Sequence, residues 1–79
     1  SNPKTVEQRI RRTAMMGLEN LAYIGIEDNL NDNFLEFSNT LYNFKDVKIE
    51  MDYIRGQSQE HGKVNIRKFL DGLQYYINR

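Results

Sequence analysis

Few side chains in this sequence are of the types that catalyse reactions or bind metals. His61 is the only histidine, and the chain has no cysteine. Neither a histidine-rich site nor a thiolate metal site can therefore form. Ser38 and Ser58 have no neighbouring base and no glycine-rich nucleophile elbow. We expect no catalytic residue, no metal and no cofactor, and we predict that the chain is not an enzyme.

One segment, Gln57 to Leu70, has the spacing of the second half of a calcium-binding helix–loop–helix. Gly62 and Val64 lie in the loop, and Phe69 lies in the helix expected to follow it. In these residues the segment resembles an EF-hand. That family needs oxygen ligands early in the loop and a bidentate Glu at its end, but the closing position here is Lys68. The early positions hold Gln57, Gln59 and His61. We expect no calcium binding, and a degenerate EF-hand-like docking domain is one alternative function.

Charged residues are unevenly distributed along a chain whose formal net charge is zero. Residues 1–12 and 55–79 are rich in Lys and Arg, whereas residues 13–46 contain one Lys against six acidic residues. Antiparallel helices would bring the two basic segments to one end of a bundle. We predict that this basic pole contacts an acidic partner or a phosphate backbone. Its residues are Arg9, Arg12, Arg55, Lys63, Arg67 and Lys68.

Apolar residues recur at helical spacing in three segments of the chain. The pattern predicts helices over residues 4–24, 33–55 and 64–78. Gly25 is expected to end the first helix. Asn33 with Glu36 is expected to cap the second, and Asn65 the third. The predicted core consists of Leu18, Leu21, Phe37, Leu41, Phe44, Phe69 and Leu73.

Three helices with short connections pack most simply as an antiparallel, up-down-up bundle. The predicted fold is therefore all-α, with residues 1–79 in a single domain. Residues 47–54 alternate apolar and polar side chains, which is typical of a half-buried strand. A β-hairpin over 47–67 is the alternative. Ser1 and Asn2 are interpreted as the remnant of a tag and are left out of the predicted fold.

Large side chains occur as adjacent pairs at two places in the predicted helices. Adjacent helical residues point about 100° apart, so both members of a pair cannot enter the same core. We expect one Met and one Tyr to remain at the surface, where such side chains suit an interface. The predicted interface residues are Met15, Met16, Tyr23, Tyr75 and Tyr76.

These features favour a non-catalytic module that binds another protein, including a second copy of itself. A nucleic-acid-binding regulator that uses the basic pole is the alternative, although zero net charge provides no overall attraction to nucleic acid. No apolar run approaches the roughly 20 residues of a membrane span. With no cysteine and no signal peptide, we expect a cytoplasmic location and no membrane partner.

Overall fold

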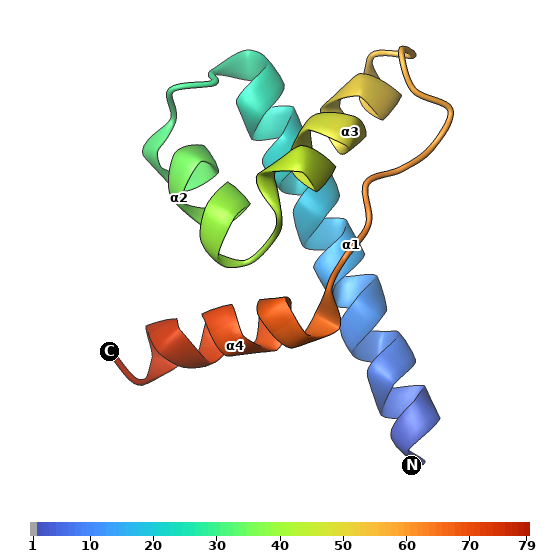
Figure 1. Ribbon diagram of the computed structural model, residues 1–79, viewed down its shortest axis with the longest axis vertical. Coiled ribbons are helices and arrows are strands. Elements are labelled where there is room, and N and C mark those ends of the chain that lie inside the picture. The colour runs from blue at the N-terminus through green and yellow to red at the C-terminus, as the bar shows by residue number, and fades with distance from the viewer. Residues whose placement is uncertain (1) are drawn as a thin grey trace.

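The computed structural model describes residues 2–79, and all regular structure in this range is helical. The helices are α1 (Pro3–Glu27), α2 (Asp32–Thr40), α3 (Phe44–Ile54) and α4 (Ile66–Ile77). Figure 1 shows α2 and α3 beside the C-terminal half of α1, while α4 runs away from the N-terminal half of α1. The prediction of an all-α fold is confirmed. The arrangement has four helices where the up-down-up bundle has three.

The second predicted helix is divided by a turn at residues 41–43. Tyr42 is buried in this turn, and its hydroxyl donates a hydrogen bond to the carbonyl oxygen of Ala14 at 2.7 Å. Asn43 has an extended backbone and precedes the first residue of α3. The break allows both α2 and α3 to turn apolar residues toward α1. The alternative of a β-hairpin over 47–67 is wrong, because α3 occupies 44–54.

Asparagine side chains cap three of the four helices. Asn65 Oδ1 accepts from the Lys68 N–H, as predicted, whereas α2 is capped by Asn31 and not by Asn33. Asn2, excluded from the predicted fold, caps α1 by accepting from the Thr5 N–H. Ser1 lies outside the described residues.

The prediction that Gly25 ends the first helix is wrong, because α1 continues to Glu27. Gly25 is buried, and a Cβ atom at this position would overlap the Phe34 ring. The glycine is therefore needed for the close approach of α2 and not as a helix stop.

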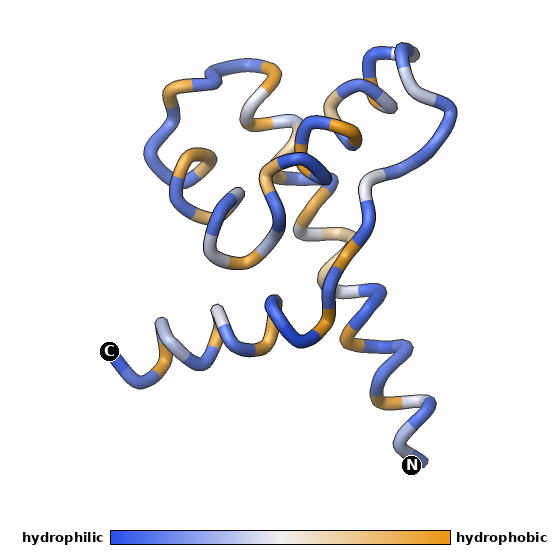
Figure 2. Tube along the Cα trace, in the orientation of Figure 1, coloured by the Kyte–Doolittle hydropathy of each residue, from blue (hydrophilic) through white to orange (hydrophobic). Residues whose placement is uncertain are grey.

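The core lies between the C-terminal half of α1 and the helices packed on it. Figure 2 shows apolar and hydrophilic residues alternating along every helix, as half-buried helices require. Leu18, Leu21 and Phe69 are buried as predicted. The prediction that Phe44 lies in the core is wrong, because Phe44 is 40% exposed. Phe37, Leu41 and Leu73 are partly buried. Ala14, Phe34, Val47 and Met51, which belong to the predicted apolar stripes, are buried as well, and Ala22 and Tyr42 are the buried apolar residues that the prediction missed.

Two buried carboxylates on α3 hold the segment that connects α3 to α4. Glu50 is 1% exposed, and its Oε1 accepts a hydrogen bond from the Gly62 N–H at 2.9 Å. His61 Nδ1 lies 3.0 Å from Glu50 Oε2. Asp46 accepts from the Lys63 N–H at 3.0 Å. This connection includes the segment that resembles an EF-hand in sequence. In the structure, carboxylates of α3 accept hydrogen bonds from backbone N–H groups of the connection.

Candidate functional site

The α2–α3 unit consists of a nine-residue and an eleven-residue helix separated by three residues. Two short helices joined by a three- to four-residue turn are typical of a helix-turn-helix. The inner face of α3 is fixed by the burial of Val47, Glu50 and Met51. The outer face of α3 is consequently held in a defined orientation.

That outer face carries a row of charged side chains, which we call the α3 stripe. Lys45, Lys48, Asp52 and Arg55 follow one another at spacings of three, four and three, which places them on one side of the helix. Lys45, Lys48 and Arg55 are exposed, and Asp52 is half-buried. Asp52 forms an ion pair with Arg55 at 3.1 Å. The stripe is positive overall, with Lys45 and Lys48 on its first turns.

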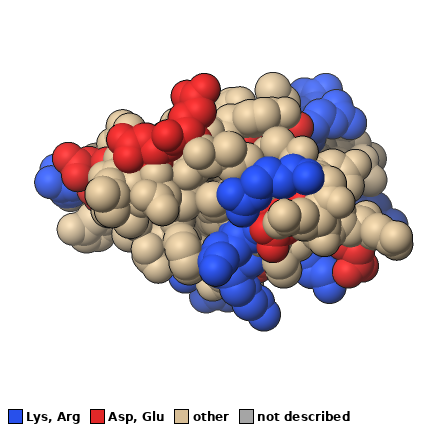
Figure 3. All heavy atoms as spheres, turned by 90° about the horizontal axis from the view of Figure 1, so that it is seen from above, with Lys and Arg blue, Asp and Glu red and all other residues tan. Residues whose placement is uncertain are grey.

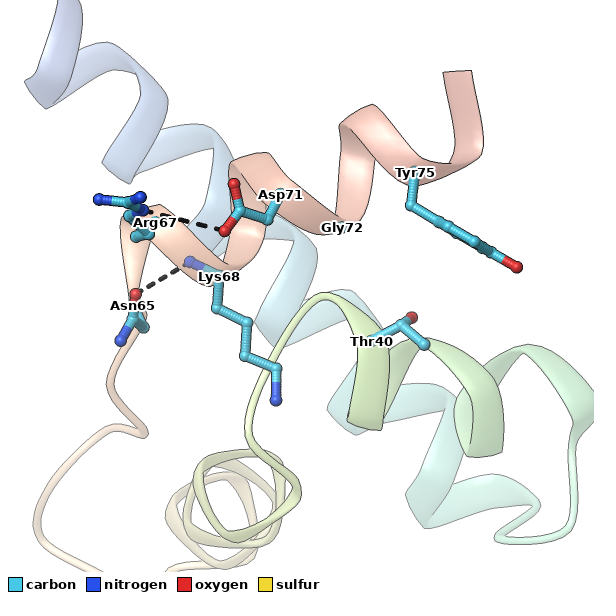
Figure 4. A pocket seen from close by; sticks show the side chains of 7 residues that line it. All are labelled: Thr40, Asn65, Arg67, Lys68, Asp71, Gly72 and Tyr75. Carbon is cyan, nitrogen blue, oxygen red and sulfur yellow. Dashed lines mark hydrogen bonds and ion pairs between the residues drawn. The ribbon is translucent and has the colours of Figure 1, made fainter. Parts of the chain in front are cut away.

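Lys68 brings a further positive charge from α4 to the beginning of α3. Its Nζ donates to Asn43 Oδ1 at 3.1 Å, and the Asn43 side chain makes no capping bond within α3. Figure 4 shows the Lys68 side chain extending from α4 toward the neighbouring helices. The Lys68 side chain of α4 therefore meets Asn43 at the residue that precedes α3.

A groove of 520 Å³ lies next to this contact, between the end of α2 and one side of α4. Gly72 forms the closest approach, because a Cβ there would meet the carbonyl oxygen of Thr40. Arg67 pairs with Asp71 at 3.9 Å, and Figure 4 shows Tyr75 extending beyond Thr40. The lining residues are Thr40, Asn65, Arg67, Lys68, Asp71, Gly72 and Tyr75.

The six residues of the predicted basic pole do not form a single surface. Arg9 and Arg12 lie on the N-terminal half of α1, whereas Arg55 follows α3, which Figure 1 shows beside the C-terminal half of α1. Lys63 belongs to the connection, and Arg67 and Lys68 to the first turn of α4. On the face in Figure 3, Lys and Arg form several separate groups, and Asp and Glu are interspersed with them, with the largest acidic group at the upper left.

Lys45 and Lys48 were missed by the sequence analysis. Their three-residue spacing on the polar side of the predicted 33–55 helix was the signal that could have identified them. That signal is weak, because most surface helices carry spaced charges on their outer face.

The predicted division of the Met and Tyr pairs is confirmed. Met15 packs against the core and Met16 is 61% exposed. Tyr75 is 61% exposed, whereas Tyr76 packs edge-on against Phe37. The Tyr76 hydroxyl bonds to Glu36 and Thr40 of α2, and the bond to Glu36 raises the pKa of Tyr76. Tyr23, the fifth predicted residue, is exposed on α1.

The model of the YcbB domain family matches residues 1–73, which is most of the chain. The chain belongs to the YcbB domain family. No curated protein and no solved structure matches it. Among residues 2–79 of this YcbB domain, no helix is long and apolar enough to cross a membrane.

Proposed function

We propose that this YcbB domain binds double-stranded nucleic acid, with α3 as the helix that lies in the groove of the duplex. The observation that carries the proposal is the α2–turn–α3 unit, whose second helix exposes the α3 stripe. In helix-turn-helix proteins the second helix lies in the major groove and the first crosses the backbone. The three-residue connection and the fixed inner face of α3 suit that role.

Electrostatics supports the same assignment even though the whole chain is neutral. Affinity for a duplex depends on Lys and Arg near its phosphates, and the distant acidic residues of a neutral chain matter less because salt screens them. Lys45 and Lys48 are exposed on α3, and Lys68 contacts Asn43 immediately before α3. Asn43 adds an amide, a group that pairs with base edges as well as with phosphates.

The start of α4 supplies the flanking contacts in this proposal. Arg67 is exposed at the first turn of α4, where a positive charge is unfavourable for the helix dipole. Neutralising phosphates at this position offsets that local cost. A regulator that binds nucleic acid, in a chain without cysteine, also fits the proposed cytoplasmic location.

The experiment is fluorescence anisotropy with a labelled duplex over a range of salt concentrations. The double variant Lys45→Ala/Lys48→Ala is compared with Lys4→Ala/Arg79→Ala, which changes the net charge equally at the two ends of the chain. Each phosphate contact contributes about 0.9 to the slope of log affinity against log salt. We expect the α3 variant to lower that slope by about two, and the control to leave it close to the parent value.

Equal slopes for the two variants would contradict the proposal, because any binding would then be independent of α3. Circular dichroism of both variants confirms that the helices are retained. All four substituted side chains are exposed, so we expect no change in helix content.

Binding to another protein is the second candidate function, and a different part of the molecule supports it. Hollows lined mainly by apolar residues, with Glu7, Arg9 and Thr13 among them, lie between α1 and α4 and outside the α3 stripe. We retain the non-catalytic assignment in both cases, because both functions depend on surface contacts alone.

A further inference from the structure

The residue before α3 differs in its contacts from the residues that precede the other three helices. Asn2, Asn31 and Asn65 each accept a backbone N–H of their own helix through the side-chain oxygen. Such a bond stabilises the first turn of a helix. Asn43 precedes α3 and makes no side-chain bond of this kind. Its side chain therefore has no capping role in its own helix.

Lys68 of α4 holds the Asn43 amide instead. The Lys68 Nζ group donates a hydrogen bond to Asn43 Oδ1 at 3.1 Å. Within residues 2–79, Ser38 Oγ is the only buried side-chain polar atom that has no hydrogen-bond partner. The Asn43 Nδ2 group, which no residue in this range binds, therefore reaches solvent. Its two N–H donors are available to a ligand.

Asn43 and Lys68, which we call the donor pair, present hydrogen-bond donors and almost no acceptor. A lysine ammonium has three donors and no acceptor, and one of the three is used by the Asn43 oxygen. That oxygen lies against a positive charge. A ligand N–H group that approached Asn43 Oδ1 would also meet the N–H groups of Lys68, and the two sets of donors would repel each other. The donor pair therefore favours a ligand with acceptors.

The major-groove edges of the four bases differ in how well they match the donor pair. Guanine presents two acceptors, O6 and N7. Adenine presents one acceptor beside an amino group, thymine presents one acceptor beside a methyl group, and cytosine presents an amino group. Asparagine ordinarily pairs with adenine, because its oxygen accepts from the adenine amino group. Lys68 opposes that pairing here, so guanine is the base that the donor pair matches.

Asn43 occupies the place where helix-turn-helix proteins contact bases. In these proteins the N-terminal residues of the second helix reach the base edges. Asn43 is half-buried and immediately precedes Phe44, the first residue of α3. The α3 stripe begins at the next residue, Lys45, which is exposed. A duplex that contacts the first turns of the stripe therefore lies close to Asn43 as well.

We propose that Asn43 contacts a guanine in the major groove and that Lys68 makes this contact select guanine over adenine. Asn43 donates from Nδ2 to the guanine edge. Lys68 is a positioning residue, because it acts by holding the Asn43 oxygen. The inference rests on the proposed function, since it requires α3 to lie in the groove. It adds a base preference, which contacts to phosphates do not supply.

The test is selection from a pool of duplexes whose central sequence is randomised, followed by sequencing of the bound fraction. The parent chain should enrich guanine at one position, and Asn43→Ala should lose that preference. Lys68→Met releases the Asn43 oxygen, so the preferred base should change from guanine to adenine. Lys68→Arg retains a donor to that oxygen and should keep guanine. A loss of positive charge alone weakens binding to all sequences alike and would not change the preferred base.

A second measurement uses the selected duplex with 7-deazaguanine, which lacks the N7 acceptor, at the enriched position. The parent chain should bind this duplex about tenfold more weakly than the unmodified one. Asn43→Ala should bind the two duplexes almost equally. Asn43→Asp keeps an oxygen beside Lys68 but has no donor, so it should disfavour guanine. Since the Asn43 side chain makes no bond within α3, circular dichroism should show that both variants retain their helices.

The two proposals fail in different ways. Binding that depends on Lys45 and Lys48 but enriches no guanine would overturn this inference and leave the proposed function intact. So would a guanine preference that persists in Asn43→Ala, or one that persists in Lys68→Met. Equal salt slopes for Lys45→Ala/Lys48→Ala and its control, or no binding to any duplex, would overturn both proposals together.

Discussion

The helices α3 and α4 use their surfaces in opposite ways. The inner face of α3 is buried, and its two carboxylates, Asp46 and Glu50, accept hydrogen bonds from the following loop. Its outer face is mainly charged, although Phe44 is 40% and Tyr53 38% exposed. By contrast, α4 buries Phe69 and Gly72 but leaves Leu70 and Ile77 exposed.

The difference shows which helix has buried most of its apolar surface within the chain and which helix has not. A helix with an apolar inner face and a charged outer face needs only water or a charged ligand outside. A helix with a second apolar side retains surface whose burial would be favourable. We therefore expect the stability of the chain to reside mainly in α1–α3.

The largest expected effect comes from removing a core side chain from the α1–α3 region. Leu18 is fully buried, so Leu18→Ala should lower the free energy of unfolding by about 2–5 kcal/mol. Leu70→Ala on α4 should cost about 1 kcal/mol or less in dilute solution, because Leu70 is already 42% exposed. Urea denaturation followed by circular dichroism measures both. Equal losses would break the distinction between the two regions.

A somewhat smaller effect is expected at alkaline pH. Burial raises the pKa of Tyr42 to about 12, above its value of about 10 in an unfolded chain. The neutral phenol therefore contributes stability that is fully present below pH 10 and is lost as pH rises through 12. The loss should reach about 3 kcal/mol.

The variant Tyr42→Phe provides the control for this pH dependence. It should unfold more easily at neutral pH by about 1 kcal/mol, because the bond to Ala14 is removed. Its stability should then change much less between pH 10 and 12, with Tyr76 as the remaining raised group. An unchanged alkaline loss would show that Tyr42 is not the residue responsible.

A third comparison concerns the loop held by α3. Glu50→Gln replaces a charged acceptor with an amide, which should cost about 1.5–3 kcal/mol. It should also speed hydrogen exchange at the Gly62 N–H, which donates a hydrogen bond to Glu50. The matched change on α4 is Asp71→Asn, whose exposed pair with Arg67 should contribute less than about 0.5 kcal/mol. Equal effects would show that Glu50 does not anchor the loop.

Much of the helical content could be predicted from the sequence, because local patterns determine it. The apolar spacing predicted three helices whose ranges cover the four observed ones, with α2 and α3 merged into one, and Asn65 is predicted as a cap from its place before an apolar run. The break at residues 41–43 could not be predicted in this way. Spacings of three and four continue through the turn, and the bond from Tyr42 to Ala14 that fixes it joins residues far apart in sequence.

The candidate site was less predictable for the same reason. Arg67 and Lys68 were identified as basic residues, but the contact between Lys68 and Asn43 depends on the placement of α4. The basic pole assumed antiparallel neighbours, an assumption that fails once the second predicted helix is divided. Arg9 and Arg12 consequently lie apart from Arg55 (Figure 1).

The most direct test of the proposed function is a nuclear magnetic resonance titration of the amide signals with a short duplex. The proposal predicts that the largest shifts fall at residues 43–48 and 65–68 and along the α3 stripe. Shifts concentrated on α1 with α3 unaffected, or no shifts at low salt, would contradict the assignment of α3 as the nucleic-acid-binding helix.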